Sequence, residues 1–169
     1  SWCDVVPPLN NIIVIANMRS MQVSLTKSPQ FTVEALRSSP MVEDISTDEL
    51  RKQLSPMAFH CTQESGTEPP FSGHHLNEKR PGTYNCVVCK EVLFRSDAKY
   101  DSQSGWPSFW QTASTEVVET KRDDSHGMVR LEASCMSCGA HLGHLFPDGP
   151  RPTGNRFCIN SACLSFDPD

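Results

Sequence analysis

Cysteine is the residue of this 169-residue chain with the greatest capacity for chemistry, and eight are present. Four of them form two Cys-x-x-Cys pairs, Cys86 with Cys89 and Cys135 with Cys138, separated by 45 residues. Two residues between thiolates let one tight turn present both sulfurs to an ion, and two such turns complete a tetrahedral shell that suits Zn²⁺. The pairs therefore predict one structural zinc ion per chain. Redox-active dithiols are the alternative interpretation.

A further cysteine, Cys158, is a candidate nucleophile. In a regular strand Arg156, Cys158 and Asn160 share one face, because side chains alternate between the two faces. A guanidinium beside a thiol favours the thiolate, which is the form that attacks. The alternative is a buried packing thiol, because buried cysteines are common and mostly inert.

Two histidines, His141 and His144, precede this cysteine, and Asp148 follows them in a Pro-Asp-Gly-Pro turn. Imidazoles can donate protons and hydrogen bonds near neutral pH, so they suit acid–base work beside a nucleophile. A second metal half-site is the competing interpretation. It is weaker, because four thiolates already satisfy one ion.

An aromatic turn, Gly105–Trp110, carries Trp106. A tryptophan ring can hold an apolar methyl group or a polarisable sulfur by dispersion and sulfur–ring contact. Packing in the hydrophobic core is the ordinary role of a tryptophan beside a proline. The turn alone does not separate these two roles.

The elements that must position these side chains are short. Ser46 and Glu49 fit a capping box for a first helix, and Ser55 with Pro56 fits the start of a second. Beyond Gln63, strand-like runs alternate with turn residues. The expected strands are Thr83–Cys89, Glu91–Arg95, Glu116–Thr120, Met128–Ser134, His141–Phe146 and Arg156–Phe166. The pattern predicts a mainly β fold with a short N-terminal helical segment.

Composition limits the partners and the compartment. A net charge of -5 argues against general affinity for nucleic acid, and no apolar run approaches the ~20 residues that span a bilayer. No secretory signal pattern is present, and paired thiolates favour a reducing compartment, so we expect an intracellular protein. Residues 1–43 have either of two interpretations, a basic, serine-rich transit segment or a flexible tail. A transit segment would make the location mitochondrial rather than cytoplasmic. Residues 44–169 are expected to form the domain.

Several motifs in order resemble the methionine sulfoxide reductase B family, from about Thr47 through Phe166. They are LSPMAFHCTQESGTEPPF, KYDSQSGWPSFW, SHGMVRLEASCMSCGAHLGHLFPDGP and PTGNRFCINSACLSF. The resemblance implies two antiparallel β-sheets in a β-tent-like arrangement, with a zinc site of four cysteines. It also implies a pocket in which Cys158 is the nucleophile, Trp106 binds the substrate methyl group, and the other catalytic positions are His141, His144, Asp148, Arg156 and Asn160.

The implied reaction reduces methionine-R-sulfoxide, free or in oxidised proteins, through a sulfenic acid at Cys158. Thioredoxin or another thiol then regenerates the cysteine, and the chain is expected to act as a monomer. Many family members place a resolving cysteine where this chain has Ser104, and others where it has Ser72. Cys61, Cys163 and Cys3 remain as candidates, with Cys61 preferred because its segment looks mobile. Direct reduction without an internal resolver is the alternative.

Two different functions would fit parts of this pattern. A non-catalytic β-tent ligand-binding module would share the paired cysteines and the aromatic pocket but needs no nucleophile. A zinc-ribbon nucleic-acid module would need a basic strip that the acidic balance opposes. The HLGH motif and Cys158 flanked by Arg156 and Asn160 favour the enzyme.

Overall fold

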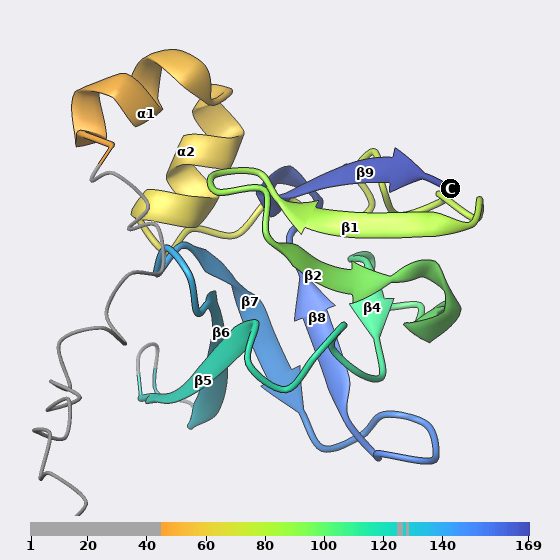
Figure 1. Cartoon of the computed structure of the whole chain (residues 1–169). Helices are drawn as coiled ribbons and strands as arrows, with labels where there is room; N and C mark the ends of the chain where they lie inside the picture. Colours follow the sequence, from red (N-terminus) through yellow and green to blue (C-terminus); the bar gives the residue numbers. More distant parts are fainter. Residues whose placement is uncertain (1–44, 125–126, 128) are drawn as a thin grey trace, which may run out of the picture. The chain divides into compact units, whose positions relative to one another are not determined.

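The strands pair into two antiparallel sheets in the computed structural model, which describes residues 45–124, 127 and 129–169 (Figure 1). The smaller sheet has the order β2-β1-β9, with β1 at Gly82–Cys86, β2 at Val92–Arg95 and β9 at Leu164–Pro168. The larger has the order β3-β4-β8-β7-β6-β5. Its strands are β3 Lys99–Tyr100, β4 Ser108–Phe109, β5 Val118–Asp123, β6 Arg130–Cys135, β7 His141–Phe146 and β8 Arg156–Ile159. The mainly β prediction with two antiparallel sheets is confirmed.

Two short helices precede the sheets, α1 at Thr47–Gln53 and α2 at Pro56–Gln63. The Ser46 side chain accepts from the Glu49 backbone N–H, and the Glu49 carboxylate accepts from the Ser46 N–H, so the predicted capping box is formed. Ser55 caps α2 by accepting from the Ala58 N–H at 3.1 Å. Both predicted helix starts are therefore confirmed. Helix α2 packs against β7 and a short 3-10 turn, η4, at Ser161–Cys163.

Aromatic side chains from both sheets form the centre of the core. Phe94 of β2 stacks on Phe109 of β4 with ring centroids 4.3 Å apart, and Tyr84 of β1 meets the same ring edge-on at 5.0 Å. Phe94 also packs on Phe157 of β8. Offset and edge-on aromatic pairs stabilise by about 1 kcal/mol beyond the area they bury. This cluster holds β8, and with it Cys158, against the smaller sheet.

The expectation of one strand over Arg156–Phe166 is wrong. The chain leaves the larger sheet after Ile159, turns through η4 and enters the smaller sheet as β9. The buried carboxylate of Glu68 causes the break, because it accepts from the backbone N–H groups of Ser161 at 2.6 Å and Ala162 at 3.0 Å. Two backbone donors that a regular strand would pair across a ladder are thus satisfied by a side chain from 93 and 94 residues away.

Smaller differences have local causes. The strand expected at Thr83–Cys89 ends at Cys86, because the cysteine pair forms a turn there. The two-residue strands β3 and β4 and the short 3-10 turn η2 at Ser96–Ala98 were not expected. Met128, Cys3 and the segment 1–43 lie outside the described residues, so the expectations on them stay predictions. Within the described ranges, no helix is both long and apolar enough to cross a membrane.

Candidate active site and metal centre

The two Cys-x-x-Cys pairs converge at one point. Each pair lies in a turn of the same kind: Lys90 N–H donates to the Cys86 carbonyl at 2.9 Å, and Gly139 N–H donates to the Cys135 carbonyl at 2.8 Å. Lys90 and Gly139 both have left-handed backbone, with φ of 65° and 73°. The two turns therefore have the same local geometry. Their four sulfurs converge from the ends of β1 and β6.

The spacing of these sulfurs fits a tetrahedral metal site. The four ligand atoms all lie within 4.8 Å of one another. Cys86 Sγ is 3.7 Å from Cys138 Sγ, and Cys89 Sγ is 3.6 Å from Cys135 Sγ. A metal with sulfur ligands at about 2.3 Å has tetrahedral edges of about 3.8 Å. The cluster can hold one metal ion through four protein ligands, as the sequence predicts, and two separate redox dithiols are disfavoured.

Cys158 lies in β8 between two neighbouring strands of the larger sheet. Its Cα partners are Ser108 of β4 and His144 of β7. The residue is half-buried and borders a pocket of about 110 Å³. The pocket is lined by Thr67, Trp106, Arg130, Gly143, His144, Phe146, Cys158 and Asn160. The structure thus brings Cys158 together with the predicted histidine at 144, the tryptophan and the asparagine.

Burial raises the pKa of the Cys158 thiol above its ordinary value. A hydrogen bond with Ser104 and the charge of Arg156 lower the same pKa, but burial outweighs both. Arg156 thus acts in the direction expected from the sequence, toward the thiolate, and burial acts against it.

Arg156 is held in place by Asp148 and Phe146. Its Nε and Nη2 donate to the two carboxylate oxygens of Asp148 at 2.8 and 2.9 Å, and its guanidinium carbon lies 4.4 Å from the Phe146 ring centroid. The same bidentate contact lowers the pKa of Asp148, which keeps that carboxylate charged. Asp148 thus orients Arg156, and Arg156 acts on Cys158.

A β-bulge brings His141 and His144 onto one face, although they are three residues apart. The register of β6 with β7 shifts so that Ala133 and Ser134 pair with Gly143 and His141, which leaves Leu142 as the extra residue. The two imidazole centroids are consequently 5.5 Å apart. A bulge of this kind is not visible in sequence periodicity.

The two imidazoles have different surroundings. His144 lines the pocket, and its Nε2 is 3.0 Å from Asp123 Oδ2. Burial lowers the pKa of His144, so its neutral form is favoured. His141 is only 4% exposed, and its Nδ1 lies 2.6 Å from Glu132 Oε1. Its buried Nε2 has no hydrogen-bond partner among the described residues.

Trp106, Glu68 and Asn160 form one hydrogen-bonded unit at the pocket wall. Trp106 Nε1 donates to the Glu68 carbonyl at 3.1 Å, and the Glu68 N–H donates to Asn160 Oδ1 at 3.1 Å. The Asn160 amide also donates to the Leu142 carbonyl at 3.1 Å. Asn160 therefore joins the Glu68 loop to β7. Glu68 was not predicted from the sequence, because no local pattern indicates that its carboxylate is buried.

Serine hydroxyls extend from the Cys158 sulfur into the core. Cys158 Sγ is 3.7 Å from Ser104 Oγ, which is 2.8 Å from Ser102 Oγ. Ser102 Oγ is in turn 2.7 Å from the fully buried Ser108. In the sequence, only the family resemblance, which places a cysteine at position 104 in many members, pointed to this chain of contacts. Ser102 and Ser108 were missed.

Gly143 was also missed, and it faces the backbone of Cys158. A Cβ at Gly143 would collide with the Cys158 carbonyl oxygen. Only glycine lets β7 approach β8 so closely at this point. The middle glycine of the HLGH motif is therefore a steric requirement of the site.

The candidate resolving cysteines lie in the core. The description of Cys61 as part of a mobile segment is wrong, because it belongs to helix α2 and is 0% exposed. Its thiol is hydrogen-bonded with that of Cys163, which is also 0% exposed and donates to the His141 carbonyl at 3.3 Å. Ser72, the other family position, is exposed and donates to the Pro69 carbonyl. A resolving role for Cys61 or Cys163 stays a prediction.

The chain is similar to a known protein family. Residues 54–168 match the family model of the SelR domain. The chain is 58% identical over 123 residues to methionine-R-sulfoxide reductase B3, mitochondrial, of Mus musculus, covering 73% of this chain and 49% of that protein. The chain thus spans about half the length of this curated relative. A solved structure, the Mis18 "Yippee-like" domain, aligns with a TM-score of 0.41 at 18% identity, over 52% of this chain and 96% of the other.

The family match contains all four cysteines of the metal cluster and every residue that lines the Cys158 pocket. It also covers more than half of the chain. By this match the chain belongs to the SelR-domain family.

Proposed function

We propose that this protein reduces the R-sulfoxide of methionine to methionine, with Cys158 as the nucleophile. The supporting observation is that Cys158 borders a pocket of about 110 Å³ that is also lined by Trp106 and His144. This space suits the end of one side chain and not a whole ligand, since drug-sized ligand sites are commonly 300–1,000 Å³. The name of the mouse relative describes the same reaction.

In the proposed reaction Cys158 Sγ attacks the sulfoxide sulfur, and the sulfur–oxygen bond of the substrate breaks. The oxygen passes to Cys158 with a proton, so that the products are methionine and a cysteine sulfenic acid. The sulfoxide gains two electrons and Cys158 loses two. Because burial raises the pKa of Cys158, its own thiol proton is available for the departing oxygen.

The remaining pocket residues support this step. His144 is the imidazole that borders the pocket and assists the proton transfer, while His141 packs beside it and orients it. Arg156, fixed by Asp148, stabilises negative charge on the attacking sulfur. Trp106 holds the methyl group and thereby selects the R epimer, and Asn160 positions the Glu68 loop that fixes the indole.

We propose that an external dithiol such as thioredoxin regenerates Cys158 directly. One thiol condenses with the sulfenic acid to give a mixed disulfide and water, and the second thiol releases Cys158. Cys61 and Cys163 are both free thiols that are fully buried and neighbour each other, and position 104 is a serine, which supports direct reduction over an internal resolver. The alternative is that Cys61 acts as an internal resolving cysteine. In that case Cys61→Ser would lose thioredoxin-driven cycling but retain one stoichiometric turnover.

The metal at the four-cysteine cluster is, in this proposal, Zn²⁺. Four thiolates in tetrahedral spacing suit this ion, and with all positions filled by protein it acts structurally and takes no part in the reaction. We also propose that residues 1–43 are an N-terminal extension or targeting segment before a domain at 44–169. The mitochondrial designation of the mouse relative supports a mitochondrial over a cytoplasmic location. We also propose that the protein acts as a monomer.

The test is turnover of the separated R and S epimers of N-acetyl-methionine sulfoxide, with dithiothreitol and then thioredoxin as reductant. Wild type should reduce the R epimer alone, and Cys158→Ser should abolish the reaction while keeping its metal and its fold. Cys89→Ser serves as the comparison that damages the metal cluster. Equal reduction of both epimers, or turnover by Cys158→Ser, would refute the assignment.

A further inference from the structure

Three serine hydroxyls and the Cys158 sulfur form one continuous chain of contacts. Cys158 Sγ is 3.7 Å from Ser104 Oγ. Ser102 Oγ lies between the two other hydroxyls, 2.8 Å from Ser104 Oγ and 2.7 Å from Ser108 Oγ. Both of these oxygen–oxygen distances are those of ordinary O–H···O hydrogen bonds. The chain ends on the backbone, because Ser108 Oγ also donates to the Trp106 carbonyl at 3.2 Å.

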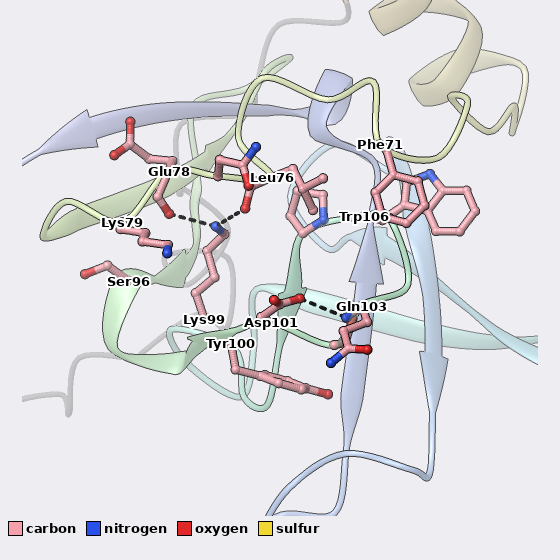
Figure 2. Close-up of a pocket in the computed structure, with 14 residues that line it drawn as sticks. Phe71, Leu76, Glu78, Lys79, Ser96, Lys99, Tyr100, Asp101, Gln103 and Trp106 are labelled. Carbon is pink, nitrogen blue, oxygen red and sulfur yellow. Dashed lines mark hydrogen bonds between the residues drawn. The ribbon is translucent and has the colours of Figure 1, made fainter.

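The fold fixes the oxygen atoms of this hydroxyl chain. Ser108 of β4 lies opposite Cys158 of β8 in the sheet and is 0% exposed. Asp101 and Gln103 flank Ser102, and the Asp101 carboxylate accepts from the Gln103 N–H at 2.9 Å (Figure 2). The positions of the oxygens are therefore set by the backbone, whereas the hydroxyl hydrogens can rotate.

Ser102 controls the direction of the hydroxyl chain. Its two contacts are both hydrogen bonds and a hydroxyl has a single hydrogen, so Ser102 donates to one neighbour and accepts from the other. If Ser102 donates to Ser108, then Ser104 donates to Ser102 and has no hydrogen left for the sulfur. If Ser102 donates to Ser104, then Ser108 donates to Ser102, and the Ser104 hydrogen is available to the sulfur. Ser104 can thus donate to Cys158 only when the whole chain points toward it.

The charge on Cys158 selects between these two directions. A thiol is a weak donor and can donate to the Ser104 oxygen, whereas a thiolate can only accept. Negative charge on the sulfur therefore favours the direction in which Ser104 donates to it. Hydrogen bonds to a charged acceptor are roughly twice as strong as neutral ones, and hydrogen bonds in a chain polarise one another. Ser102 and Ser108 therefore stabilise a negative sulfur through Ser104.

Charged and titratable groups from the neighbouring elements also surround Cys158. They are Arg156 of β8, Asp148 of the loop after β7, His144 of β7, Arg130 of β6 and Tyr100 of β3. Burial raises the pKa of Cys158, while the Ser104 hydrogen bond and the Arg156 charge lower it. Removing a serine hydroxyl leaves all these groups in place. A change in the reactivity of Cys158 after that removal therefore measures the hydroxyl chain itself.

We propose that Ser102 and Ser108 are positioning residues that align the Ser104 hydroxyl, so that it donates to the Cys158 sulfur as negative charge develops there. This inference rests on the proposed function and adds two residues to its machinery. The hydrogens rotate and no proton leaves a serine, so this alignment involves no oxidation or reduction. It favours the attack on the sulfoxide by stabilising the attacking form of the sulfur.

The experiment follows two reactions of Cys158 in each variant. One is alkylation by iodoacetamide across pH, located by mass spectrometry, and the other is a single turnover of N-acetyl-methionine-R-sulfoxide without reductant. Ser102→Ala should shift the alkylation profile to higher pH and slow both reactions near pH 7 by about threefold, because the charge-assisted chain is cut. Ser108→Ala should act in the same direction by less. Circular dichroism checks that each variant is folded.

Two single variants serve as controls. Ser102→Thr keeps the hydroxyl and should restore both rates to near the wild-type values. Ser114→Ala removes an exposed hydroxyl that lies outside the chain and should behave as wild type. A loss of rate in Ser102→Thr equal to that in Ser102→Ala would contradict a role for the hydroxyl.

A double variant shows whether Ser102 acts through Ser104. Ser104→Ala alone should shift the alkylation profile to higher pH, and adding Ser102→Ala should shift it no further, because the connection to the sulfur is already lost. An unshifted profile in Ser102→Ala, or a full further shift in the double variant, overturns the hydroxyl chain while wild type still reduces the sulfoxide. If wild type does not reduce the R-sulfoxide, the proposed function itself fails, and with it the role of the chain in that reaction.

Discussion

Ser104 Oγ lies 3.7 Å from Cys158 Sγ, within hydrogen-bond distance of this sulfur. Ser102 Oγ lies 2.8 Å from Ser104 Oγ and holds that hydroxyl in place. The hydroxyl lowers the pKa of Cys158 in opposition to burial. A cysteine at this position, as the family resemblance implies for many members, would place its sulfur beside that of Cys158.

Ser104→Cys should therefore create an internal resolving thiol. After one turnover without reductant, the new thiol should condense with the sulfenic acid and form a disulfide with Cys158, because the atoms need to move only from about 3.7 Å to about 2 Å. Mass spectrometry of non-reduced tryptic peptides detects the link. Ser72→Cys, an exposed position, is the control. A persistent free thiol at residue 104 after turnover would contradict this geometry.

The contribution of Arg156 can be measured through the reactivity of Cys158. Arg156 lowers the pKa of Cys158, so Arg156→Gln should raise that pKa further above its already raised value. The thiolate fraction near pH 7 then falls, and alkylation by iodoacetamide should slow by roughly tenfold and recover at higher pH. Arg95→Gln changes an exposed arginine on β2 and should leave the rate unaltered. A faster reaction in Arg156→Gln would contradict the assigned direction.

Glu68 should matter for stability although it is far from Cys158 in sequence. Its buried carboxylate accepts from the backbone N–H groups of Ser161 and Ala162, and these are charge-assisted hydrogen bonds. Glu68→Gln should lower the free energy of unfolding in urea by about 1–3 kcal/mol. Glu116→Gln, at an exposed position, should change it by less than about 0.5 kcal/mol. Equal stabilities of the two variants would remove the proposed role of the carboxylate.

The metal cluster should contribute to folding and not to chemistry. Elemental analysis should give one zinc per chain, and a strong chelator should lower the melting temperature by more than about 10 °C, because binding and folding are linked at such sites. Cys61→Ser, which leaves all four ligands in place, should keep its zinc. Intact zinc-free protein with unchanged melting would show that the four sulfurs need no ion.

Local sequence patterns predicted the features that depend on few neighbouring residues. The capping box before α1, the Ser55 cap of α2, the range of β7 and the meeting of the two cysteine pairs were all accessible in this way. Each is set by spacing within one turn or one strand. The motif comparison supplied Trp106, His144, Cys158 and Asn160 of the pocket, whereas Thr67, Arg130, Gly143 and Phe146 were not anticipated.

The features that were missed depend on distant partners. The break after Ile159 exists because Glu68 supplies acceptors from a loop more than ninety residues earlier. The burial of Cys61 follows from the packing of α2 on η4, whereas the sequence suggested a mobile segment. The bulge at Leu142 and the short strands β3 and β4 leave no periodic signal. No local pattern encodes such contacts.

In the proposed reaction the oxygen of the sulfoxide is transferred to Cys158. One equivalent of N-acetyl-methionine-R-sulfoxide, added to reduced protein without any reductant, should yield one equivalent of N-acetyl-methionine. A dimedone adduct should then appear on the peptide that contains Cys158. Formation of the product with the adduct on a different cysteine, or with no adduct on Cys158, would contradict the account.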